Sequence, residues 1–390
     1  MQIRNAIVVG AGIGGLAAAI ALARRGVAVT VLEQSEAIRE IGAGLQVSPN
    51  GLFVLRALGL EKRLAARGAV RGQAAVMRSY DQADDVMRLD FSRLDPDQAY
   101  YFMHRADLID VLAQAAREQN VSFEFGARVV SVTAGEPPSL TLQDGSTRRA
   151  ELIVGADGIH SRARVALNAE DKADFTGQVA WRATVPNTMG HADVAMVTMG
   201  PKRHLVSYPL RGGNLVNLVA VEERKTWAAE GWNHADDPAH LREAFAGWGG
   251  MAAQMIEAVE APTLWGLHRH PVAPVWQQSG VALLGDAAHP TLPFLAQGAN
   301  MALEDAWALT ATVMSGGVKA LPAYEAMRKP RVTRVIKAAE GNAWKFHLRR
   351  GPVRFVAHNV MRLGGKYAPG KMLGAFDWLY GYDVTAHAPR

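Results

Sequence analysis

Apolar and polar positions follow two different patterns along the chain, and the amino-terminal part shows the first of them. Residues 6–9 form a short branched apolar run, and residues 27–32 form another that ends at Glu33. Between these runs, apolar side chains recur at helical spacing, at Ile13, Leu16, Ala17 and Ile20. Short runs without alternation are typical of strands buried on both faces of a parallel sheet. The pattern therefore predicts a strand–helix–strand unit over residues 1–33.

The second pattern fills the middle of the chain. From residue 176 to 271, short alternating runs are separated by Gly, Pro and Asn, which predicts an antiparallel sheet with one covered face. On both sides of this region the buried-strand type returns, at 151–154 and 281–284. Helices are predicted over 105–119 and from about 298 to 313.

Together these patterns predict an α/β protein with an inserted α+β unit. The parallel-sheet unit is discontinuous, and comprises residues 1–75, 101–175 and 272–345. The inserted mixed-sheet unit comprises residues 76–100 and 176–271, and residues 346–390 form a C-terminal helical segment. A chain of 390 residues suits two such units that share an interface.

Composition narrows the class of protein. Apolar residues make up 49% and charged residues 20%, which excludes disorder as the main state. The 42 basic and 37 acidic residues are scattered, so no nucleic-acid partner is expected. The absence of cysteine excludes disulfides, thiolate nucleophiles and thiolate metal sites, and favours a reducing cytoplasm. No HExxH motif is found, so we expect no metal. Glycines break up the uncharged run 6–23, so we expect no membrane span.

A cluster of basic residues with helical spacing lies between residues 328 and 337. Few aromatic residues are interleaved with it, which favours a solvated helix face over a nucleic-acid site. Its members are Arg328, Lys329, Arg331, Arg334 and Lys337.

The glycines between the first strand and the first helix match GxGxxG. Gly10 allows the tight turn, Gly12 allows the backbone to approach a pyrophosphate, and Gly15 allows close packing of the helix. The helix N-terminus then faces the phosphate charge, and Glu33 would accept hydrogen bonds from ribose hydroxyls. The motif predicts a bound dinucleotide and leaves NAD and FAD both open.

A second candidate site follows the strand at 281–284. Asp286 stands at the carboxyl end of that strand, where ligands bind in open α/β sheets. Gly298 would open a helix whose amides can stabilise negative charge on a ligand. We interpret the nearby His289 as a packing histidine rather than a functional one.

Four motifs of the sequence resemble those of a known protein family. GAGIGG with Glu33, HRADL from His104, GADGIHSRAR from Gly155 and LGDAAHPTLPFLAQGANMALEDA from Leu284 are similar to motifs of the single-component FAD-dependent aromatic hydroxylases. Within that family the chain looks most like the branch of salicylate, 3-hydroxybenzoate and 6-hydroxynicotinate hydroxylases. The resemblance covers nearly the whole chain, and implies a Rossmann-like FAD-binding domain with a second, substrate-binding domain.

The resemblance also implies roles for individual residues. It places Gly14, Gly15, Glu33 and Gln34 on the ADP half of FAD, Val129 near the adenine and Arg105 near the flavin. Around the ribityl chain and ring it places Asp286, Gly298, Ala299 and Asn300. It associates Asp157 with FAD and with the passing nicotinamide cofactor, and Gln297 with the substrate. Pro293 would form one wall of a dry pocket for the oxygen chemistry.

His204 and Tyr208 are the candidate catalytic pair. The hydroxybenzoate enzymes of this branch carry a His and a Tyr at the same spacing of four, and on a strand that spacing puts both side chains on one face. A neutral His can take the proton of a phenol, which raises electron density in the ring. The alternative is a core His and Tyr joined by a hydrogen bond.

The resemblance implies a FAD-dependent monooxygenase that hydroxylates a small phenolic acid of the salicylate or 3-hydroxybenzoate type through a flavin hydroperoxide. NADH or NADPH would be the transient reductant, O2 the co-substrate, and the protein a monomer or homodimer. A hydroxylated N-heteroaromatic such as 6-hydroxynicotinate is the alternative substrate. A flavin-free NAD-dependent dehydrogenase and a non-catalytic binding relative are the alternatives of other classes.

Overall fold

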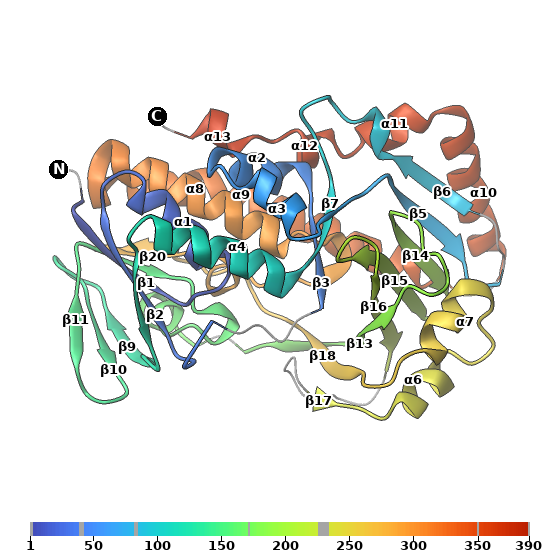
Figure 1. The fold of residues 1–390 in the computed structure, drawn as a ribbon, viewed down its shortest axis with the longest axis horizontal. Helices are drawn as coiled ribbons and strands as arrows, with labels where there is room; N and C mark the ends of the chain where they lie inside the picture. The colour runs from blue at the N-terminus through green and yellow to red at the C-terminus, as the bar shows by residue number, and fades with distance from the viewer. Residues whose placement is uncertain are drawn as a thin grey trace.

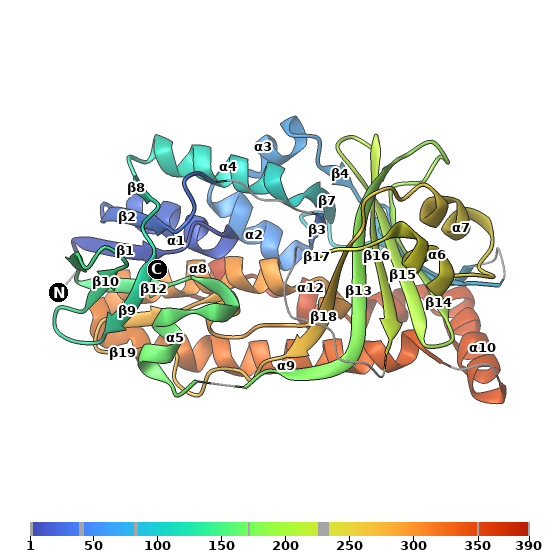
Figure 2. The same cartoon turned by 90° about the horizontal axis from the view of Figure 1, so that it is seen from below.

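Two large sheets with their own helices lie side by side, and C-terminal helices run along both (Figure 1, Figure 2). The structure is a computed structural model that describes residues 3–38, 43–81, 85–170, 172–224, 234–348 and 351–388; the side chains of 342–345 are not described. This is the predicted α/β class with an inserted mixed sheet.

The first sheet is the predicted parallel one. Its order is β19-β20-β12-β1-β2-β8, and only β19 pairs antiparallel. Its strands are β1 (Asn5–Val9), β2 (Ala28–Glu33), β8 (Ser122–Phe125), β12 (Leu152–Gly155), β19 (Gln277–Gln278) and β20 (Val281–Leu283). The four predicted buried strands are confirmed, each shifted by at most one residue at either end. Because parallel strands end at one edge, this sheet gathers Gly10, Glu33 and Asp286 from distant parts of the chain.

Apolar helices cover one face of the parallel sheet. Helix α1 (Ile13–Ala23) is rich in alanine and buried over most of its length, so α4 (Arg105–Glu118) and α8 (Gly298–Gly316) pack closely against it (Figure 1). Both of these helices were predicted. The shorter α2 (Pro49–Ala57) and α3 (Glu61–Ala66) extend this layer, while α5 (Arg162–Leu167) packs against β12 and β20. Two small sheets complete the unit: β9 (Val129–Thr133), β10 (Ser139–Leu142) and β11 (Thr147–Arg149), and β3 (Gly44–Val47), β4 (Val70–Arg71) and β7 (Tyr101–His104).

The second sheet has the order β17-β18-β13-β16-β15-β14-β5-β6. Its strands are β5 (Ala74–Ser79), β6 (Asp85–Asp90), β13 (Asp174–Pro186), β14 (Val194–Gly200), β15 (Arg203–Leu210), β16 (Leu215–Glu223), β17 (His234–Ala235) and β18 (Thr263–Arg269). Its strands bury apolar residues on both faces, so the prediction of a single covered face is wrong. The outer face, with Trp181 and Leu205, packs under α6 (Pro238–Ala244) and α7 (Gly250–Glu257). The inner face turns toward the parallel-sheet unit.

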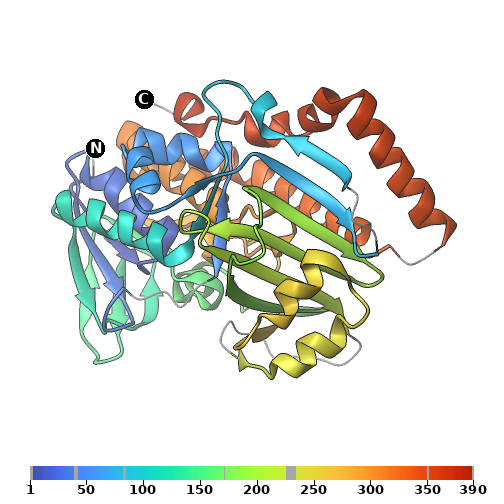
Figure 3. The ribbon, with the colours of Figure 1, turned by 45° about the vertical axis from the view of Figure 1, so that its right-hand side comes forward.

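The C-terminal helices connect the two units. Helix α9 (Leu321–Phe346) runs beneath both sheets in Figure 2, and α10 (Pro352–Tyr367) packs against β6, beside the second sheet in Figure 3. The helices α11 (Pro369–Gly374), α12 (Asp377–Tyr380) and α13 (Val384–His387) return toward the first unit. Among the helices of the described ranges, none combines the length and apolar character needed to cross a membrane.

The prediction of a solvated helix face for the basic cluster on α9 is wrong for Arg328 and Arg331, while Arg334 and Lys337 are exposed. The guanidinium of Arg328 is fully buried and pairs with Glu304 and Asp305, and Arg331 pairs with Glu304 as well. Arg334 stays exposed and stacks on the ring of Trp378. Helical spacing alone could not reveal this, because the two buried acids lie on another helix, α8.

Candidate active site

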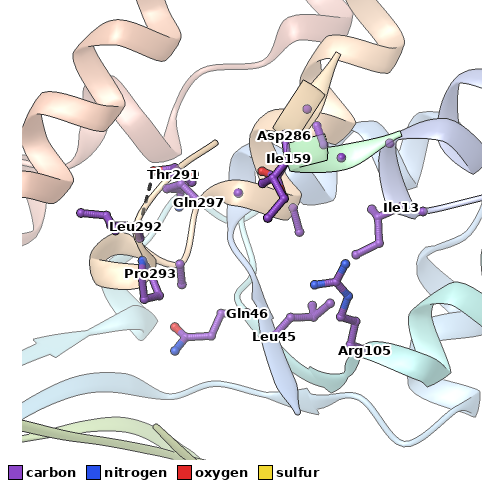
Figure 4. Close-up of a pocket in the computed structure, with 18 of the residues that line it drawn as sticks. Ile13, Leu45, Gln46, Arg105, Ile159, Asp286, Thr291, Leu292, Pro293 and Gln297 are labelled. Atoms are coloured by element: carbon purple, nitrogen blue, oxygen red, sulfur yellow. Dashed lines mark hydrogen bonds between the residues drawn. The ribbon is translucent and has the colours of Figure 1, made fainter. Parts of the chain in front are cut away.

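One cavity of about 670 Å³ extends from the parallel sheet to the inner face of the second sheet. At one end it is lined by the residues that follow β1, β2, β12 and β20, and at the other by side chains of the inserted sheet. Figure 4 shows its middle, where Arg105 and Asp286 lie at one side and Pro293 and Gln297 at the other. The cavity therefore joins the two candidate sites found in the sequence.

The glycine turn leaves space where a phosphate group would approach. Gly10 adopts φ +101°, and a Cβ on Gly15 would lie 2.1 Å from the carbonyl oxygen of Gly10. A Cβ on Gly12 would meet no atom within 4 Å, although Gly12 lines the cavity at the uncapped N-terminus of α1. Free amides, helix dipole and open space at one point fit a pyrophosphate.

This geometry gives a test of cofactor binding. Gly12→Ala should leave the fold intact, because its Cβ meets no protein atom, but should weaken FAD binding about tenfold or more, because the methyl group occupies the space for phosphate. Titration of the apoprotein with FAD, followed by flavin fluorescence, measures the Kd. Gly341→Ala on α9, which also meets nothing within 4 Å, is the matched control. An unchanged Kd in Gly12→Ala would remove the glycine turn from the cofactor site.

The residues beyond β2 form the end of the cavity where the adenosine would lie. Glu33 accepts hydrogen bonds from the backbone N–H groups of Ala11 and Ser35, each at 2.9 Å, so its carboxylate is fixed beside the glycine turn. Carboxylate oxygens have further lone pairs, and these can accept from ribose hydroxyls. Gln34 and Val129 line the same end of the cavity.

The two candidate aspartates differ in what their carboxylates contact. Asp157 accepts from the backbone N–H of Arg162 at 2.7 Å and from the hydroxyl of Ser161, so it caps α5 while it also lines the cavity. Burial raises the pKa of Asp286, and the neighbouring His289 and Arg105 only partly offset this. Asp286 also lines the cavity, and its position after β20 fits the hydroxyls of a ribityl chain.

His289 packs in the interior, as we expected, although its Nδ1 has no hydrogen-bond partner among the described residues. It is buried, its Nε2 lies 2.5 Å from Asp305 Oδ2, and its ring stacks on Trp276.

The N-terminus of α8 presents backbone amides to the cavity, and its side chains hold the surrounding elements. Asn300 donates to the carbonyls of Gln46 and Ala296 and accepts from Ser48 N–H. The amide of Gln297 donates to Ser48 and accepts from Asn50. The free amides of Gly298 and Ala299, which line the cavity, thus fit an anionic ring edge, whereas the buried Asn300 does not line it. A contact between Gln297 and substrate stays a prediction.

His204 and Tyr208 lie on the inner face of the second sheet and both line the cavity. The prediction that one face of a strand carries both is confirmed. Within the described ranges no hydrogen bond joins them, and Nδ1 of His204 lies 2.6 Å from Nε2 of His347. Burial, with a smaller contribution from the neighbouring His347, lowers the pKa of His204 well below its ordinary value, and burial raises that of Tyr208. At neutral pH the pair therefore offers a proton acceptor and a hydrogen-bond donor.

Arg182, which was not among the predicted site residues, lines the same end of the cavity from β13. Its guanidinium stacks over the ring of Trp265 at 4.3 Å, and its charge acts on the pKa of Tyr208. The sequence does contain a feature that could have identified it, because Arg182 is the one charged residue in the otherwise uncharged strand segment Val179–Val185. Among the described residues, no cluster of His and acidic side chains could hold a metal.

The fold and the cavity define the class of this protein as a dinucleotide-binding α/β protein. We call the end of the cavity at the inserted sheet, which is lined by Arg182, His204 and Tyr208, the substrate chamber. Comparison with known proteins identifies the family. A family model described as "FAD binding domain" matches residues 4–339. The chain is 33% identical to a 3-amino-4-hydroxybenzoate 2-monooxygenase of Streptomyces platensis, over 98% of this chain and 97% of that protein. It is 34% identical to the 3-hydroxybenzoate 6-hydroxylase of Polaromonas naphthalenivorans, over 97% and 96%.

A solved structure gives the same result for the fold. Klebsiella pneumoniae HpxO complexed with FAD and uric acid superimposes with a TM-score of 0.83, at 25% identity over 96% of this chain and 97% of that one. The chain belongs to the single-component FAD-dependent aromatic hydroxylase family. It is thus a FAD-dependent monooxygenase, which decides against the flavin-free dehydrogenase and the non-catalytic relative.

Proposed function

We propose that this monooxygenase hydroxylates a small phenolic aromatic acid, with NADH or NADPH as the reductant and O2 as the co-substrate. The observation that carries the proposal is the set of groups on the inner face of the second sheet. A guanidinium, a neutral imidazole and a protonated phenol, those of Arg182, His204 and Tyr208, line one chamber. The guanidinium matches the carboxylate of such a substrate, and the imidazole and the phenol match its ring hydroxyl.

The cofactor site would use the residues described above. Gly12 and the N-terminus of α1 would hold the pyrophosphate, Glu33 the ribose and Asp286 the ribityl chain, with the α8 amides at the ring. When bound, FAD supplies the redox chemistry by which electrons from the reductant activate dioxygen and one oxygen atom reaches the substrate. The rest of the work falls to this chain's own side chains.

Those side chains bind, orient and deprotonate the substrate. Arg182 would bind the carboxylate, and Tyr208 would donate a hydrogen bond to the ring oxygen. His204 would accept the phenolic proton, which concentrates electron density on the ring carbons ortho and para to the oxygen. Pro293, Leu292 and apolar residues of the second sheet would exclude water from the reacting carbon.

The relatives guide the choice of substrate. Their names specify 3-amino-4-hydroxybenzoate and 3-hydroxybenzoate, which both carry a carboxylate and a ring hydroxyl. A hydroxylated N-heteroaromatic acid such as 6-hydroxynicotinate presents the same two groups and is the second candidate, since a relative of Bordetella bronchiseptica is named for it. That the enzyme acts as a monomer or homodimer stays a prediction, which light scattering of the FAD-loaded protein tests.

A substrate panel tests the proposal. FAD-loaded enzyme should consume NADH or NADPH faster with at least one of salicylate, 3-hydroxybenzoate, 4-hydroxybenzoate, 3-amino-4-hydroxybenzoate and 6-hydroxynicotinate. Mass spectrometry should find a product that has gained one oxygen atom. Phenol, which lacks the carboxylate, should be a poor substrate. Release of hydrogen peroxide without product for the whole panel would refute the proposed substrate class.

Arg182→Gln tests how the substrate carboxylate is recognised. Losing a charge-assisted hydrogen bond should raise KM for the acid about tenfold to a hundredfold. KM for phenol should change little, because phenol has no group for Arg182 to bind. Equal increases in both KM values would mean that Arg182 only supports the fold through Trp265.

A further inference from the structure

His204 is connected, on the side away from the cavity, to a second histidine and a carboxylate. Its Nδ1 lies 2.6 Å from Nε2 of His347, and Nδ1 of His347 lies 3.0 Å from Oε1 of Glu223. The three residues come from β15, from the residue after α9 and from the end of β16. They form an unbroken row of hydrogen bonds, which we call the His–His–Glu row.

The row leads from the cavity wall to solvent. His204 is 2% exposed and lines the cavity, and the side chain of His347 is also only 2% exposed. The side chain of Glu223 is 38% exposed. A proton that enters at His204 can therefore reach water at Glu223 without crossing a gap.

The row also determines which nitrogen of His204 is the base. A carboxylate only accepts, so Nδ1 of a neutral His347 carries its proton toward Glu223 and its Nε2 accepts. Nδ1 of His204 must then donate to that Nε2, and Nε2 of His204 keeps its lone pair. No residue in the described ranges hydrogen-bonds to this Nε2, so it can accept a proton from a ligand in the cavity.

The surrounding structure holds the row in place. The backbone N–H of Lys202 donates to the carbonyl of His347, and the N–H of Glu223 donates to the carbonyl of Lys202. The rings of Phe294 and Phe346 lie 5.9 and 5.3 Å from the His204 ring. The neighbouring carboxylate on β16, that of Glu222, pairs instead with Arg203 at 3.0 Å and with Arg224 at 2.8 Å. The row is therefore a built arrangement rather than a chance contact.

We propose that the His–His–Glu row is a proton relay that carries the phenolic proton of the substrate from the cavity to solvent. The proposal rests on the proposed function. The phenolic O–H proton passes to Nε2 of His204 as the Nδ1 proton of His204 moves to Nε2 of His347. The Nδ1 proton of His347 then moves to Glu223, which releases it to water. Hydroxylation consumes one proton overall, and a proton that returns along the same row resets both imidazoles.

The burial of His204 and His347 favours passage of the proton along the row over its retention on either imidazole. It lowers the pKa of His204 and of His347, so neither imidazole holds a positive charge at neutral pH. The carboxylate of Glu223 offsets this in part for His347, which favours movement of the proton outward.

The relay is tested by the rate at which a bound phenol ionises. FAD-loaded, oxidised enzyme is mixed in a stopped-flow instrument with the most active acid of the substrate panel, and phenolate absorbance is followed. His347→Gln should slow phenolate formation about tenfold or more, because an amide can accept from His204 but cannot pass a proton on. Added imidazole should restore part of the rate. Glu223→Gln should slow it too, and Glu222→Gln is the matched control on the same strand.

The outcomes are distinct. Wild-type rates in both His347→Gln and Glu223→Gln would overturn the relay, as would a slow rate that imidazole does not restore. A loss of rate in Glu222→Gln equal to that in Glu223→Gln would also overturn it. If the wild-type enzyme binds none of the panel, the proposed function fails, and the relay with it. Because Glu223 is partly exposed, its variant should fold even if that of His347 does not.

Discussion

Replacement of Arg328 by methionine should destabilise the protein by about 3–5 kcal/mol, the cost of leaving buried charge uncompensated. The guanidinium is fully buried, with Nε 2.8 Å from Asp305 Oδ1 and Nη1 2.5 Å from Glu304 Oε2. Without it, two buried carboxylates lose their shared cation. Arg331 and His289 would remain as partial compensation, which keeps the expected loss within this range.

Urea unfolding of the FAD-loaded protein, followed by tryptophan fluorescence, measures this effect. Arg334→Met on the same helix is the control, because Arg334 is exposed and its contact with Trp378 is worth about 1 kcal/mol or less. If both variants shift the midpoint equally, the buried cluster is not a major source of stability.

The buried cluster of Arg328, Glu304 and Asp305 also makes the free energy of unfolding depend on pH in the acid range. Burial alone would raise the pKa of Asp305, but His289 and Arg328 outweigh it and bring the pKa to about 2, against 3.8 ordinarily. Because the folded pKa is depressed, this contribution is complete above pH 3.8 and is lost as pH falls toward 2. In Arg328→Met the loss should begin at a higher pH, since less positive charge holds the proton off Asp305.

His204→Gln should lower the rate of substrate hydroxylation by about 10²–10⁴, the contribution of a positioned general base. Glutamine keeps the approximate shape of the ring but cannot take the phenolic proton. Tyr208→Phe should give a smaller loss, because it removes one hydrogen bond and leaves the base in place. In both variants FAD should remain bound, since neither residue belongs to the glycine turn or the α8 terminus.

The quantity to measure is the coupling, which is the fraction of the NADH consumed that yields hydroxylated product. The ratio of hydroxylated product to NADH consumed should fall, and hydrogen peroxide should account for the difference. His191→Gln is the control, because His191 is buried on the same unit and bonds Ser207 outside the cavity. Wild-type coupling in His204→Gln and Tyr208→Phe would remove the pair from the mechanism.

The sequence was sufficient to predict the parts of the site that depend on local order. A strand, a glycine turn, a helix and an acid occur in succession from Asn5 to Glu33, so their geometry follows from local rules. Asp286 could be predicted because the carboxyl end of a parallel strand is a defined place. The shared face of His204 and Tyr208 follows from the two-residue period of a strand.

The remainder of the site depends on pairings between distant segments. His347 lies 143 positions from His204, in a segment that shows no motif, and no period relates it to β15. Arg328 looked solvated because its partners Glu304 and Asp305 belong to another helix. Burial, and with it the pKa of each group, arises only once the chain has packed.

Helix α9 gives the molecule a mechanical property. Its 26 residues span about 39 Å; near one end Tyr324 donates a hydrogen bond to the carbonyl of Leu283 at the end of β20, and the other end carries Phe346 to the wall of the cavity. Pro330 removes one backbone hydrogen bond midway, beside Arg328 and Arg331, whose ion pairs fasten that turn. Because one helix contacts both units, we expect it to resist rotation of one unit against the other, so that ligands would enter and leave through local movements at the mouth of the cavity.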